Sequence, residues 1–516
     1  MKRIISILLC LAMLAGSLTG CTAAGTPKEY VPVGDLLGED AIAAQEAQAA
    51  EEEDPFTLAY YPDETFNPLS CADFTNRMIC SLVYQGLFTT NRDGEIIPIL
   101  CKSYTASSDL TVYDFTIDPT ATFSDGVPVT PEDVVASLRE SMDYKYFGRR
   151  LRFVNAIEVT EDREVRIYLM QPNGNLPLLL DIPIVKAAEV EAENPLGTGP
   201  YKLHGYGRNR SLVRRDNWWC ESNDFVLDYD KIPLVPAQTP AEVRDSFEFY
   251  GVDLVCADPC SDLYAEYRCD YELWDCDNGI FVYLAINEDS PVFQSAEVRR
   301  AISRGINRDL LADKYYRGFA KGAALPASPS SPFYTPALAK QYDYDPTAYQ
   351  MSISLVKGQK ITLLVNSSDS LRLRVAQEIG RMLNTSGLLV EVDARTEDYY
   401  YGALREGEYD MYLGQTKLSP NMDLSVFFAE DGPLNYGGLD DVGMYTMCLQ
   451  AVENQGDYYT LHQAVMEDGY LCPVVFRSYA IYATRGVLDD LQPARDNVFC
   501  YSIGRSLMDA YVVQGM

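Results

Sequence analysis

The sequence is poor in positive charge and in histidine. Its 516 residues hold 42 Lys and Arg side chains against 75 Asp and Glu, for a formal net charge of -33. A chain this acidic, with no basic stripe, is not expected to bind nucleic acid. Only His204 and His462 occur, which excludes a His-Glu-x-x-His zinc site, and no Gly-x-Ser-x-Gly nucleophile motif is present. We therefore expect a protein that is not an enzyme, with no cofactor and no metal.

Long apolar runs are also scarce, and a short one stands at the start of the chain. Lys2 and Arg3 precede an apolar run over residues 4–15, and small residues follow it. A helix that crosses a bilayer needs about 20 apolar residues, more than this run offers. The order of charge, apolar core and small residues is that of a secretory signal peptide. We predict a leader over residues 1–20.

The leader ends in Leu18-Thr-Gly-Cys21, which resembles the lipobox of bacterial lipoproteins. The resemblance implies cleavage before Cys21 and a diacylglyceryl group on its thiol, and two acyl chains give a stable membrane anchor. It also implies a location on the extracellular face of the cell membrane, or in the periplasm if the host has an outer membrane. The alternative is an ordinary signal peptide in which Cys21 is incidental.

Residues 21–54 are expected to form a flexible acidic tether. Residues 22–54 carry nine acidic side chains against one lysine, and Tyr30 is their single aromatic residue. A segment so charged and so poor in apolar residues buries too little surface to offset the entropy of ordering it. A local helix over residues 41–50 is the alternative, and it would leave this role unchanged.

Thirteen cysteines occur, of which one lies in the leader and one is the predicted lipid site. The remaining eleven are an odd number and cannot all pair. The spacing of Cys256, Cys260, Cys269 and Cys276 allows one or two local disulfides in an exported protein, but it matches no common zinc pattern. The alternative is that all eleven are buried thiols.

Local patterns in the body, residues 55–516, predict a mixed α/β fold. Apolar residues alternate along residues 111–117 and 165–169, which is the period of half-buried strands. The run Thr130-Pro131-Glu-Asp predicts the start of a helix with Thr130 as its N-cap. A body of about 460 residues exceeds the size at which one core usually divides, so at least two lobes are expected.

The second half of the body predicts a parallel sheet. Residues 361–365 and 388–392 have the composition of buried strands, and apolar residues recur every fourth position over residues 371–383 between them. Strand, helix and strand in about 30 residues predict a right-handed βαβ unit. Residues 409–413 are expected to add a strand to the same sheet.

Several segments of the body follow one another in a recognisable order: Asn67-Pro-Leu, Val83-Tyr-Gln-Gly-Leu-Phe88, Phe123-Ser-Asp-Gly-Val-Pro-Val-Thr-Pro-Glu-Asp-Val134, Gly197-Thr-Gly-Pro-Tyr201, Tyr283-Leu-Ala-Ile-Asn287 and Val298-Arg-Arg-Ala-Ile302. The third is the most specific, because a turn, an N-cap and an apolar helix face coincide in it. This order resembles solute-binding protein family 5 of ABC importers, the group of oligopeptide- and dipeptide-binding lipoproteins. The resemblance covers nearly the whole chain after residue 55.

The resemblance implies an α/β fold of the periplasmic-binding-protein-like kind, a two-lobed clam of type II from the large peptide-binder subgroup, with an extra subdomain in lobe I. The parts that we expect are a leader (1–20), a tether (21–54), lobe I (55–80, 196–276 and 476–516), its extra subdomain (81–195) and lobe II (277–475).

The resemblance also implies the function of a substrate-binding protein. A peptide, peptide-like or other small solute would bind between the lobes, hinge closure would trap it, and the permease subunits of an ABC importer would receive it. The protein is expected to be a monomer that meets the membrane through the lipid on Cys21. The alternatives are a surface receptor, sensor or chaperone on the same fold, and a binder of a non-peptide solute.

The strand ends that match the family supply candidate ligand contacts, and the loop after residue 413 is the strongest candidate. Peptide binders of the family commonly carry an aspartate there that pairs with the peptide's amino terminus. In Gly414-Gln-Thr-Lys-Leu-Ser-Pro-Asn-Met-Asp423, Leu418 or Ser419 stands in its place. Asp423 is expected either to replace this anchor or to cap the stretch that follows, and Lys417 would favour an acidic solute. The predicted ligand-binding residues are Asn67, Phe74, Tyr201, Asn287, Gly414, Thr416, Ser419 and Asp423.

Overall fold

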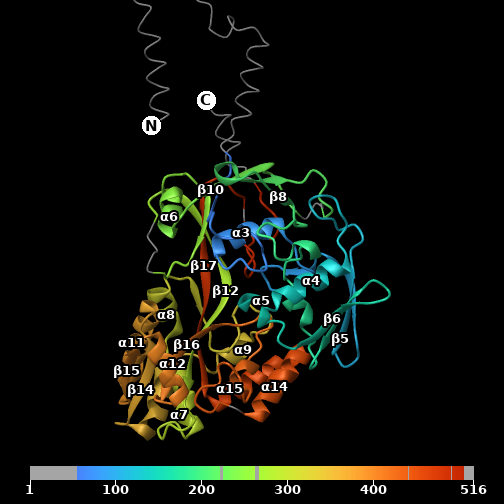
Figure 1. The fold of residues 1–516 in the computed structure, drawn as a ribbon. Helices are drawn as coiled ribbons and strands as arrows, with labels where there is room; N and C mark the ends of the chain where they lie inside the picture. The colour runs from blue at the N-terminus through green and yellow to red at the C-terminus, as the bar shows by residue number, and fades with distance from the viewer. Residues whose placement is uncertain (1–54, 221–224, 262–266, 440, 490, 505–516) are drawn as a thin grey trace, which may run out of the picture. The chain divides into compact units, whose positions relative to one another are not determined.

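A computed structural model describes residues 55–504, apart from 221–224, 262–266, 440 and 490 (Figure 1). The predicted leader, the predicted lipid site Cys21 and the tether lie outside the described residues. Within the described part of the chain, no helix is both long enough and apolar enough to cross a bilayer.

Eleven of the described strands form one large sheet. Ten of them follow the order β15-β14-β16-β12-β17-β11-β1-β10-β9-β8, and β13 pairs with β17 beside this path. Their bounds are β1 (Leu58–Tyr60), β8 (Tyr201–His204), β9 (Ser211–Arg214), β10 (Lys231–Pro236), β11 (Leu254–Ala257), β12 (Tyr271–Ile286), β13 (Ala320–Gly322), β14 (Lys360–Asn366), β15 (Leu389–Arg395), β16 (Met411–Lys417) and β17 (Leu471–Thr484).

The long antiparallel strands β12 and β17 run through both halves of this sheet (Figure 1). One hydrophobic core draws its residues from 56–254, 276 and 481–503, and we call this part lobe I. Two further hydrophobic cores are formed by residues from the range 281–476, and we call this part lobe II. Leu178, from outside this range, also packs in one of these two cores. The structure therefore has two lobes joined by crossing strands. The residue bounds predicted for the parts stay predictions.

Lobe I carries a second sheet in the order β4-β5-β7-β6, formed by β4 (Cys101–Ala106), β5 (Val112–Ile117), β7 (Val165–Leu169) and β6 (Val154–Val159). Along β5 buried and partly buried residues alternate, as the sequence predicts. The predicted helix start is also confirmed, because α4 (Pro131–Ser141) begins with a capping box. The Thr130 hydroxyl accepts a hydrogen bond from the Asp133 backbone, and the Asp133 carboxylate accepts one from the Thr130 backbone.

Lobe II contains the predicted βαβ unit. Strands β14 and β15 pair in parallel, and α11 (Ser370–Leu383) connects them. Apolar residues of α11, including Val375 and Ile379, are buried against the sheet, and Asp369 caps the helix through the backbone N–H of Arg372. The predicted strand near residue 411 is β16, which pairs in parallel with β14 and antiparallel with β12.

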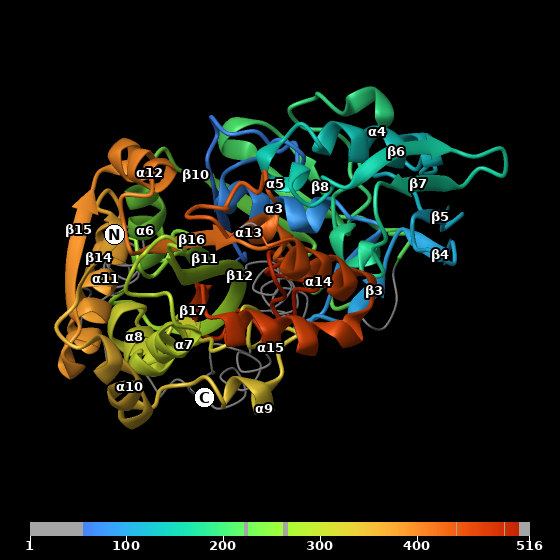
Figure 2. The same cartoon turned by 90° about the horizontal axis from the view of Figure 1, so that it is seen from below.

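The strands β14 and β15 and the second sheet of lobe I lie at opposite ends of the body in both views (Figures 1 and 2). The remaining strands and α-helices are α3 (Phe74–Val83), β2 (Phe88–Thr90), β3 (Ile96–Pro98), α5 (Lys145–Gly148), α6 (Pro240–Glu248), α7 (Ala296–Gly305), α8 (Arg308–Tyr315), α9 (Pro336–Ala339), α10 (Pro346–Ile353), α12 (Glu397–Glu406), α13 (Ser425–Phe428), α14 (Val442–Glu453) and α15 (Tyr458–Asp468).

The eleven cysteines of the described body are all unbonded, so the local disulfides that their spacing allows do not form in this structure. Burial raises the pKa of several of these thiols, to about 11 for Cys260 and for Cys500. A raised thiol pKa lowers the fraction of reactive thiolate at neutral pH. Six of the eleven are buried and five are partly buried, so the alternative of eleven buried thiols is correct for six of them.

Candidate ligand-binding cleft

A cleft of about 480 Å³ lies where α3 and α5 of lobe I meet the end of β16 in lobe II. We call it the α5 cleft. Its volume is within the range of sites for small molecules. Lobe I supplies Leu69, Ser70, Cys71, Ala72, Arg77, Tyr144, Lys145, Tyr146, Arg149 and Arg150, and lobe II supplies Lys417, Leu418 and Ser419.

The ring of Tyr146 is the centre of this cleft. The guanidinium carbon of Arg77 lies 3.7 Å from the ring centroid, and Lys417 Nζ and the guanidinium carbon of Arg150 lie 4.9 Å and 5.3 Å from it. Asp73 positions Arg77 by capping α3 through the backbone N–H of Asn76. One aromatic ring thus holds cations from both lobes, an arrangement stabilised by the negative face of the π system.

Asp496 is the acidic counterpart of these cations. Its carboxylate lies 2.5 Å from Lys417 Nζ and 3.7 Å from guanidinium nitrogens of both Arg150 and Arg495. Burial by itself would raise the pKa of Asp496, but the positive charges of Lys417, Arg495, Arg77 and Arg150 hold it well below its usual range. Asp496 therefore stays ionised at neutral pH.

Lys417 is buried among the same charges. Burial, with the guanidinium groups of Arg495 and Arg77, lowers the pKa of Lys417 to about 8, although Asp496 opposes this shift. The Arg495 guanidinium also donates hydrogen bonds to the backbone carbonyls of Leu418 and Ser419. These contacts join the end of β16 in lobe II to residues 495 and 496 of lobe I.

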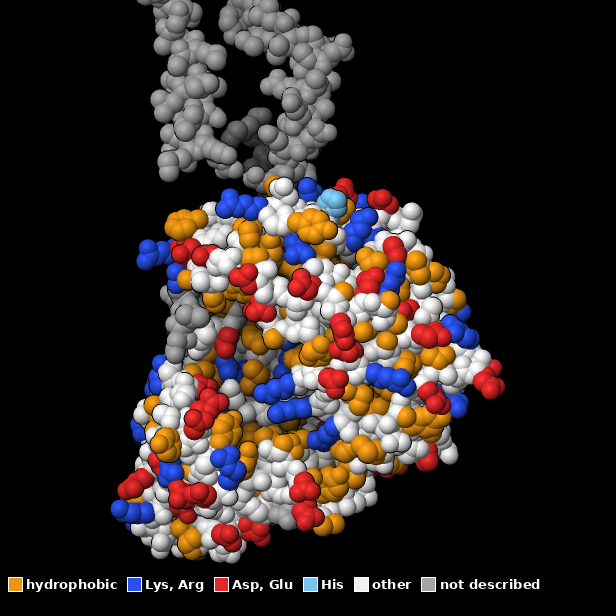
Figure 3. All heavy atoms as spheres, in the orientation of Figure 1, with side chains coloured by type: hydrophobic (Ala, Val, Ile, Leu, Met, Phe, Trp, Pro, Cys, Tyr) orange, Lys and Arg blue, Asp and Glu red, His pale blue; other side chains and the backbone are white. Residues whose placement is uncertain are grey.

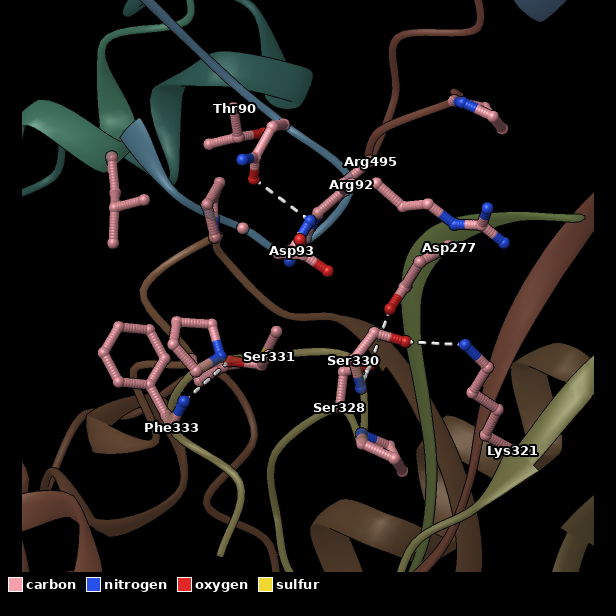
Figure 4. A pocket seen from close by; sticks show the side chains of 18 of the residues that line it. Thr90, Arg92, Asp93, Asp277, Lys321, Ser328, Ser330, Ser331, Phe333 and Arg495 are labelled. Carbon is pink, nitrogen blue, oxygen red and sulfur yellow. Dashed lines mark hydrogen bonds between the residues drawn. The ribbon is translucent and has the colours of Figure 1, made fainter. Parts of the chain in front are cut away.

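A second cavity of about 270 Å³ lies between the β2–β3 loop and residues 328–333 (Figure 4). We call it the hairpin cavity. A narrow space lies between the two cavities. It is lined by Arg77 and Tyr146, which also line the α5 cleft, and by Arg495, which also lines the hairpin cavity. In Figure 4, Ser328 donates a hydrogen bond to Asp277, and Lys321 donates one to Ser330 at 2.8 Å. Polar groups of the hairpin cavity are therefore paired with one another.

The predicted residues of the 414–423 loop lie in different surroundings. Ser419 lines the α5 cleft. Gly414 and Thr416 are buried in β16, and a Cβ on Gly414 would lie 2.5 Å from Tyr283 Cζ. Asp423 pairs with Arg152 and accepts a hydrogen bond from the backbone of Ser425 at the start of α13. The Asp423 carboxylate is thus paired within the protein. The N-cap residue of α13 is Leu424, which makes no side-chain cap hydrogen bond, so both roles predicted for Asp423, amine anchor and helix cap, stay predictions.

The other predicted residues make structural contacts. Asn67 donates hydrogen bonds to the carbonyls of residues 190 and 192. Tyr201 is 0% exposed and donates to the Tyr229 carbonyl, so it lies in the core of lobe I and does not line the cleft. Asn287 bonds to the carbonyls of residues 407 and 409. Phe74 packs against Tyr479 of β17, with ring centroids 4.5 Å apart, on the lobe I side of the crossing strands.

Sequence reasoning missed four residues of the cleft wall, Arg77, Tyr146, Arg149 and Arg150. It also missed Arg495 and Asp496, which line the narrow space beside the cleft. One local signal was available. Lys145-Tyr-Phe-Gly-Arg-Arg150 is a basic and aromatic run in a chain with a large excess of acidic residues. No local pattern relates that run to Lys417 or Asp496, which reach it only through the tertiary fold.

Among the residues that the structure describes, no three His, Cys, Asp or Glu side chains gather as a metal site would require. Two lobes joined by long crossing strands, with a cleft lined from both sides, define the class of two-lobed solute-binding proteins.

Residues 95–431, more than half of the chain, match the family described as bacterial extracellular solute-binding proteins, family 5 Middle, and the chain belongs to this family. A nickel-binding periplasmic protein of Escherichia coli (strain K12) is 24% identical over 376 residues, which cover 66% of this chain and 71% of that protein. A glutathione-binding protein of Salmonella typhi is 23% identical over 299 residues, 55% of this chain and 57% of its own.

The fold is also found in solved structures. The structure of HbpA2 from Haemophilus parasuis aligns with a TM-score of 0.74 at 17% sequence identity, covering 87% of this chain and 99% of that one. Members of the family are extracytoplasmic binding proteins of ABC importers. The chain is accordingly a solute-binding protein and not an enzyme.

Proposed function

We propose that this protein is a lipid-anchored, monomeric substrate-binding protein that captures a peptide or peptide-like solute between its lobes and delivers it to the permease of an ABC importer. The observation that carries the proposal is the α5 cleft, because Arg77 and Tyr146 from lobe I and Lys417 and Ser419 from lobe II line one space. A solute held by both walls favours the closed arrangement over the open one.

Direct contacts between the lobes support a closing motion. Arg152 pairs with Asp423, the Asn175 amide donates to the Val452 carbonyl at 3.0 Å, and Lys417 pairs with Asp496. Each contact breaks when the lobes separate. A ligand in the cleft adds further contacts across the same gap, which shifts the population towards the closed form by its differential affinity.

The membrane anchor rests on the Leu18-Thr-Gly-Cys21 motif. The test is the Cys21→Ala variant, which we expect to be released from the membrane fraction into the medium or periplasm while the parent chain stays bound. An unchanged membrane fraction for Cys21→Ala would contradict the lipid anchor and leave solute binding untouched.

The solute-binding role is tested by a native mass spectrum of the full-length chain, purified in mild detergent from a peptide-rich culture, beside its denatured control. We expect an extra mass that disappears on denaturation. A fragmentation pattern of a peptide would support the peptide assignment. A chain without bound solute, beside a peptide binder that arrives loaded from the same culture, would contradict it.

A non-peptide solute is the second candidate, and one observation favours it. Peptide binders of the family hold the peptide amine with an aspartate, and here Leu418, which is buried, or Ser419 stands at that position. Asp423 forms an ion pair with Arg152. An ammonium group without an anionic partner is costly to bury. Named relatives bind nickel or glutathione, which supports a small solute in general. A sensing or chaperone role on the same fold remains an alternative that a transport assay separates.

A further inference from the structure

The α5 cleft is basic although the protein is strongly acidic. Five of its thirteen lining residues are Lys or Arg and none is Asp or Glu, whereas Lys and Arg make up 42 of the chain's 516 residues. Figure 3 shows Lys and Arg side chains gathered along a hollow in the middle of the drawn face, near the position of α5 in Figure 1. Composition alone would place about one cation in a wall of this size.

Two of the five cations are neutralised by carboxylates of the protein. Arg150 pairs with Asp181 and Asp496, and Lys417 pairs with Asp496. These two carboxylates line the narrow space beside the cleft, where Arg495 also approaches Asp496. Asp496 is therefore shared among several cations, Arg77 among them, and its single negative charge offsets only part of their positive charge.

Within the described part of the chain, the charged groups of the other three cations, Arg77, Lys145 and Arg149, make no direct ion pair or hydrogen bond, although the negative charge of Asp496 also acts on Arg77. Arg77 is half-buried and rests on the face of the Tyr146 ring, which fixes its position without using its N–H groups. Arg149 and Lys145 are exposed. The guanidinium of Arg77 is thus held in place with its donors available.

We propose that the α5 cleft binds a small organic anion that presents a carboxylate or phosphate group to Arg77, with Arg149 and Lys145 adding charge beside it. This inference rests on the proposed solute-binding function and names the class of its ligand. A planar guanidinium offers paired N–H donors that match an oxyanion. Because the cleft lies between two lobes, closure removes water and strengthens these charge-assisted bonds.

The excess charge also gives a reason for ligand-driven closure. Lobe I brings Arg77, Arg149 and Arg150 towards Lys417 of lobe II, and like charges repel at this range. Asp496 offsets part of this repulsion. A bound anion offsets more of it, so the anion stabilises the closed lobes more than a neutral solute of the same size would.

The test uses the full-length chain, purified in mild detergent at low ionic strength, and three single substitutions. Arg77→Gln removes the central donor, and we expect its affinity for the anion to fall by a factor of about 10 or more. Arg149→Gln removes an exposed charge without side-chain partners among the described residues, so folding is not at risk, and we expect a loss of about threefold. The matched control is Arg244→Gln, because Arg244 is an exposed arginine on α6 whose ion pair among the described residues is with its neighbour Asp245.

The probes are two matched pairs, Glu-Glu with Gln-Gln and glucose 6-phosphate with glucose, titrated by calorimetry. Solute that copurifies with the chain is also released by denaturation and identified by mass spectrometry. We expect the anion of at least one pair to bind at least tenfold more tightly than its partner, and the control variant to bind like the parent. A response to the dipeptide pair indicates an acidic peptide as the source, and a response to the sugar pair indicates a non-peptide anion.

The outcomes separate this inference from the proposed function. If a neutral or cationic solute copurifies, or if probes bind but neither anion binds more tightly than its neutral partner, the anion class is wrong and solute binding stands. If an anion binds but Arg77→Gln and Arg149→Gln both bind it like the control, the assigned site is wrong. If no solute copurifies and no probe binds, both the inference and the proposed function are overturned.

Discussion

The α5 cleft and the hairpin cavity lie between the same two lobes but differ in how their charges are arranged. The hairpin cavity contains three cations, Arg92, Lys321 and Arg495, and three acids, Asp93, Asp275 and Asp277. The wall of the α5 cleft contains five cations and no acid.

The difference shows that a charged group already paired within the protein is less available to bind a ligand. In the hairpin cavity, Asp275 lies 3.9 Å from both Arg92 and Lys321, and Asp277 accepts a hydrogen bond from Ser328. Groups that are already paired must give up these contacts before they bind a ligand. In the α5 cleft, Arg77 gives up no such contact, so it can contribute more to the affinity for an anion than Arg92 of the hairpin cavity.

Asp496→Asn is expected to cause the largest loss in the free energy of unfolding. The substitution leaves Lys417, Arg150 and Arg495 without their shared carboxylate, and breaking a buried ion pair in this way costs about 3–5 kcal/mol. Urea unfolding followed by tryptophan fluorescence measures the loss, because Trp218, Trp219 and Trp274 all pack in or beside lobe I.

The matched control for Asp496→Asn is Asp275→Asn in the hairpin cavity. The Asp275 side chain is 40% exposed and its cations are distant, so we expect a loss below about 1 kcal/mol. Equal losses from the two substitutions would contradict the difference between the cavities.

Acidification from pH 7 to 4 is expected to act on lobe II and not on the charges around Asp496, because Lys417 is protonated and Asp496 ionised throughout this range. His462 is 0% exposed, and burial lowers its pKa to about 4 from the usual 6.5. Below pH 6.5 the His462 ring becomes protonated in the unfolded chain, whereas in the folded chain it stays neutral down to about pH 4. His462 therefore does not lower the free energy of unfolding above pH 6.5, but lowers it by about 3 kcal/mol as the pH approaches 4.

The measurement is urea unfolding between pH 7 and 4 for the parent and for His462→Leu. Neither ring nitrogen of His462 has a hydrogen-bond partner among the described residues, so leucine leaves no polar group unpaired. We expect the variant to lose less stability on acidification. The same pH dependence in both proteins would show that other groups are responsible.

Gly414→Ala separates residues of the cleft from residues that support it. A Cβ at this position would lie 2.5 Å from Tyr283 Cζ and 2.7 Å from its hydroxyl oxygen. We expect a loss of about 1–3 kcal/mol of unfolding free energy with little change in solute affinity. A weakened affinity with unchanged stability would instead make Gly414 a direct ligand contact, as the sequence predicts.

The smallest effect is expected from the ring beneath Arg77. Tyr146→Leu removes the aromatic face that Arg77, Arg150 and Lys417 share, and we expect affinity for the anion to fall by about 0.5–2 kcal/mol. Tyr146→Phe keeps the ring and loses the hydroxyl, which lies 3.4 Å from Lys417 Nζ, so its effect should be smaller. Calorimetric titration compares the two, and a larger effect of Tyr146→Phe would contradict the role of the ring.

Much of the fold could be predicted from local sequence, whereas little of the cleft could. The capping box at Thr130 and the alternation along β5 depend on residues a few positions apart, so the sequence displays them directly. The sequence suggests Lys417 as a contact for an acidic solute and Ser419 as a ligand contact. It does not indicate Arg77 and Tyr146, which share the cleft with them, and it predicts a ligand contact for Tyr201, which lies in the core.

The periodic elements, the family and the excess of acidic residues can be read from the amino-acid sequence, because each of these depends on composition or on neighbours in the chain. The place where positive charge gathers depends instead on tertiary packing. Lys417 meets Tyr146 across 271 positions and Asp496 across 79. Local propensities carry no information on such distant pairs, and the positive φ of 61° at Asp496 is an exception to them. The packing of two lobes around β12 and β17 brings Lys417 and Tyr146 into one cleft and places Asp496 against Lys417.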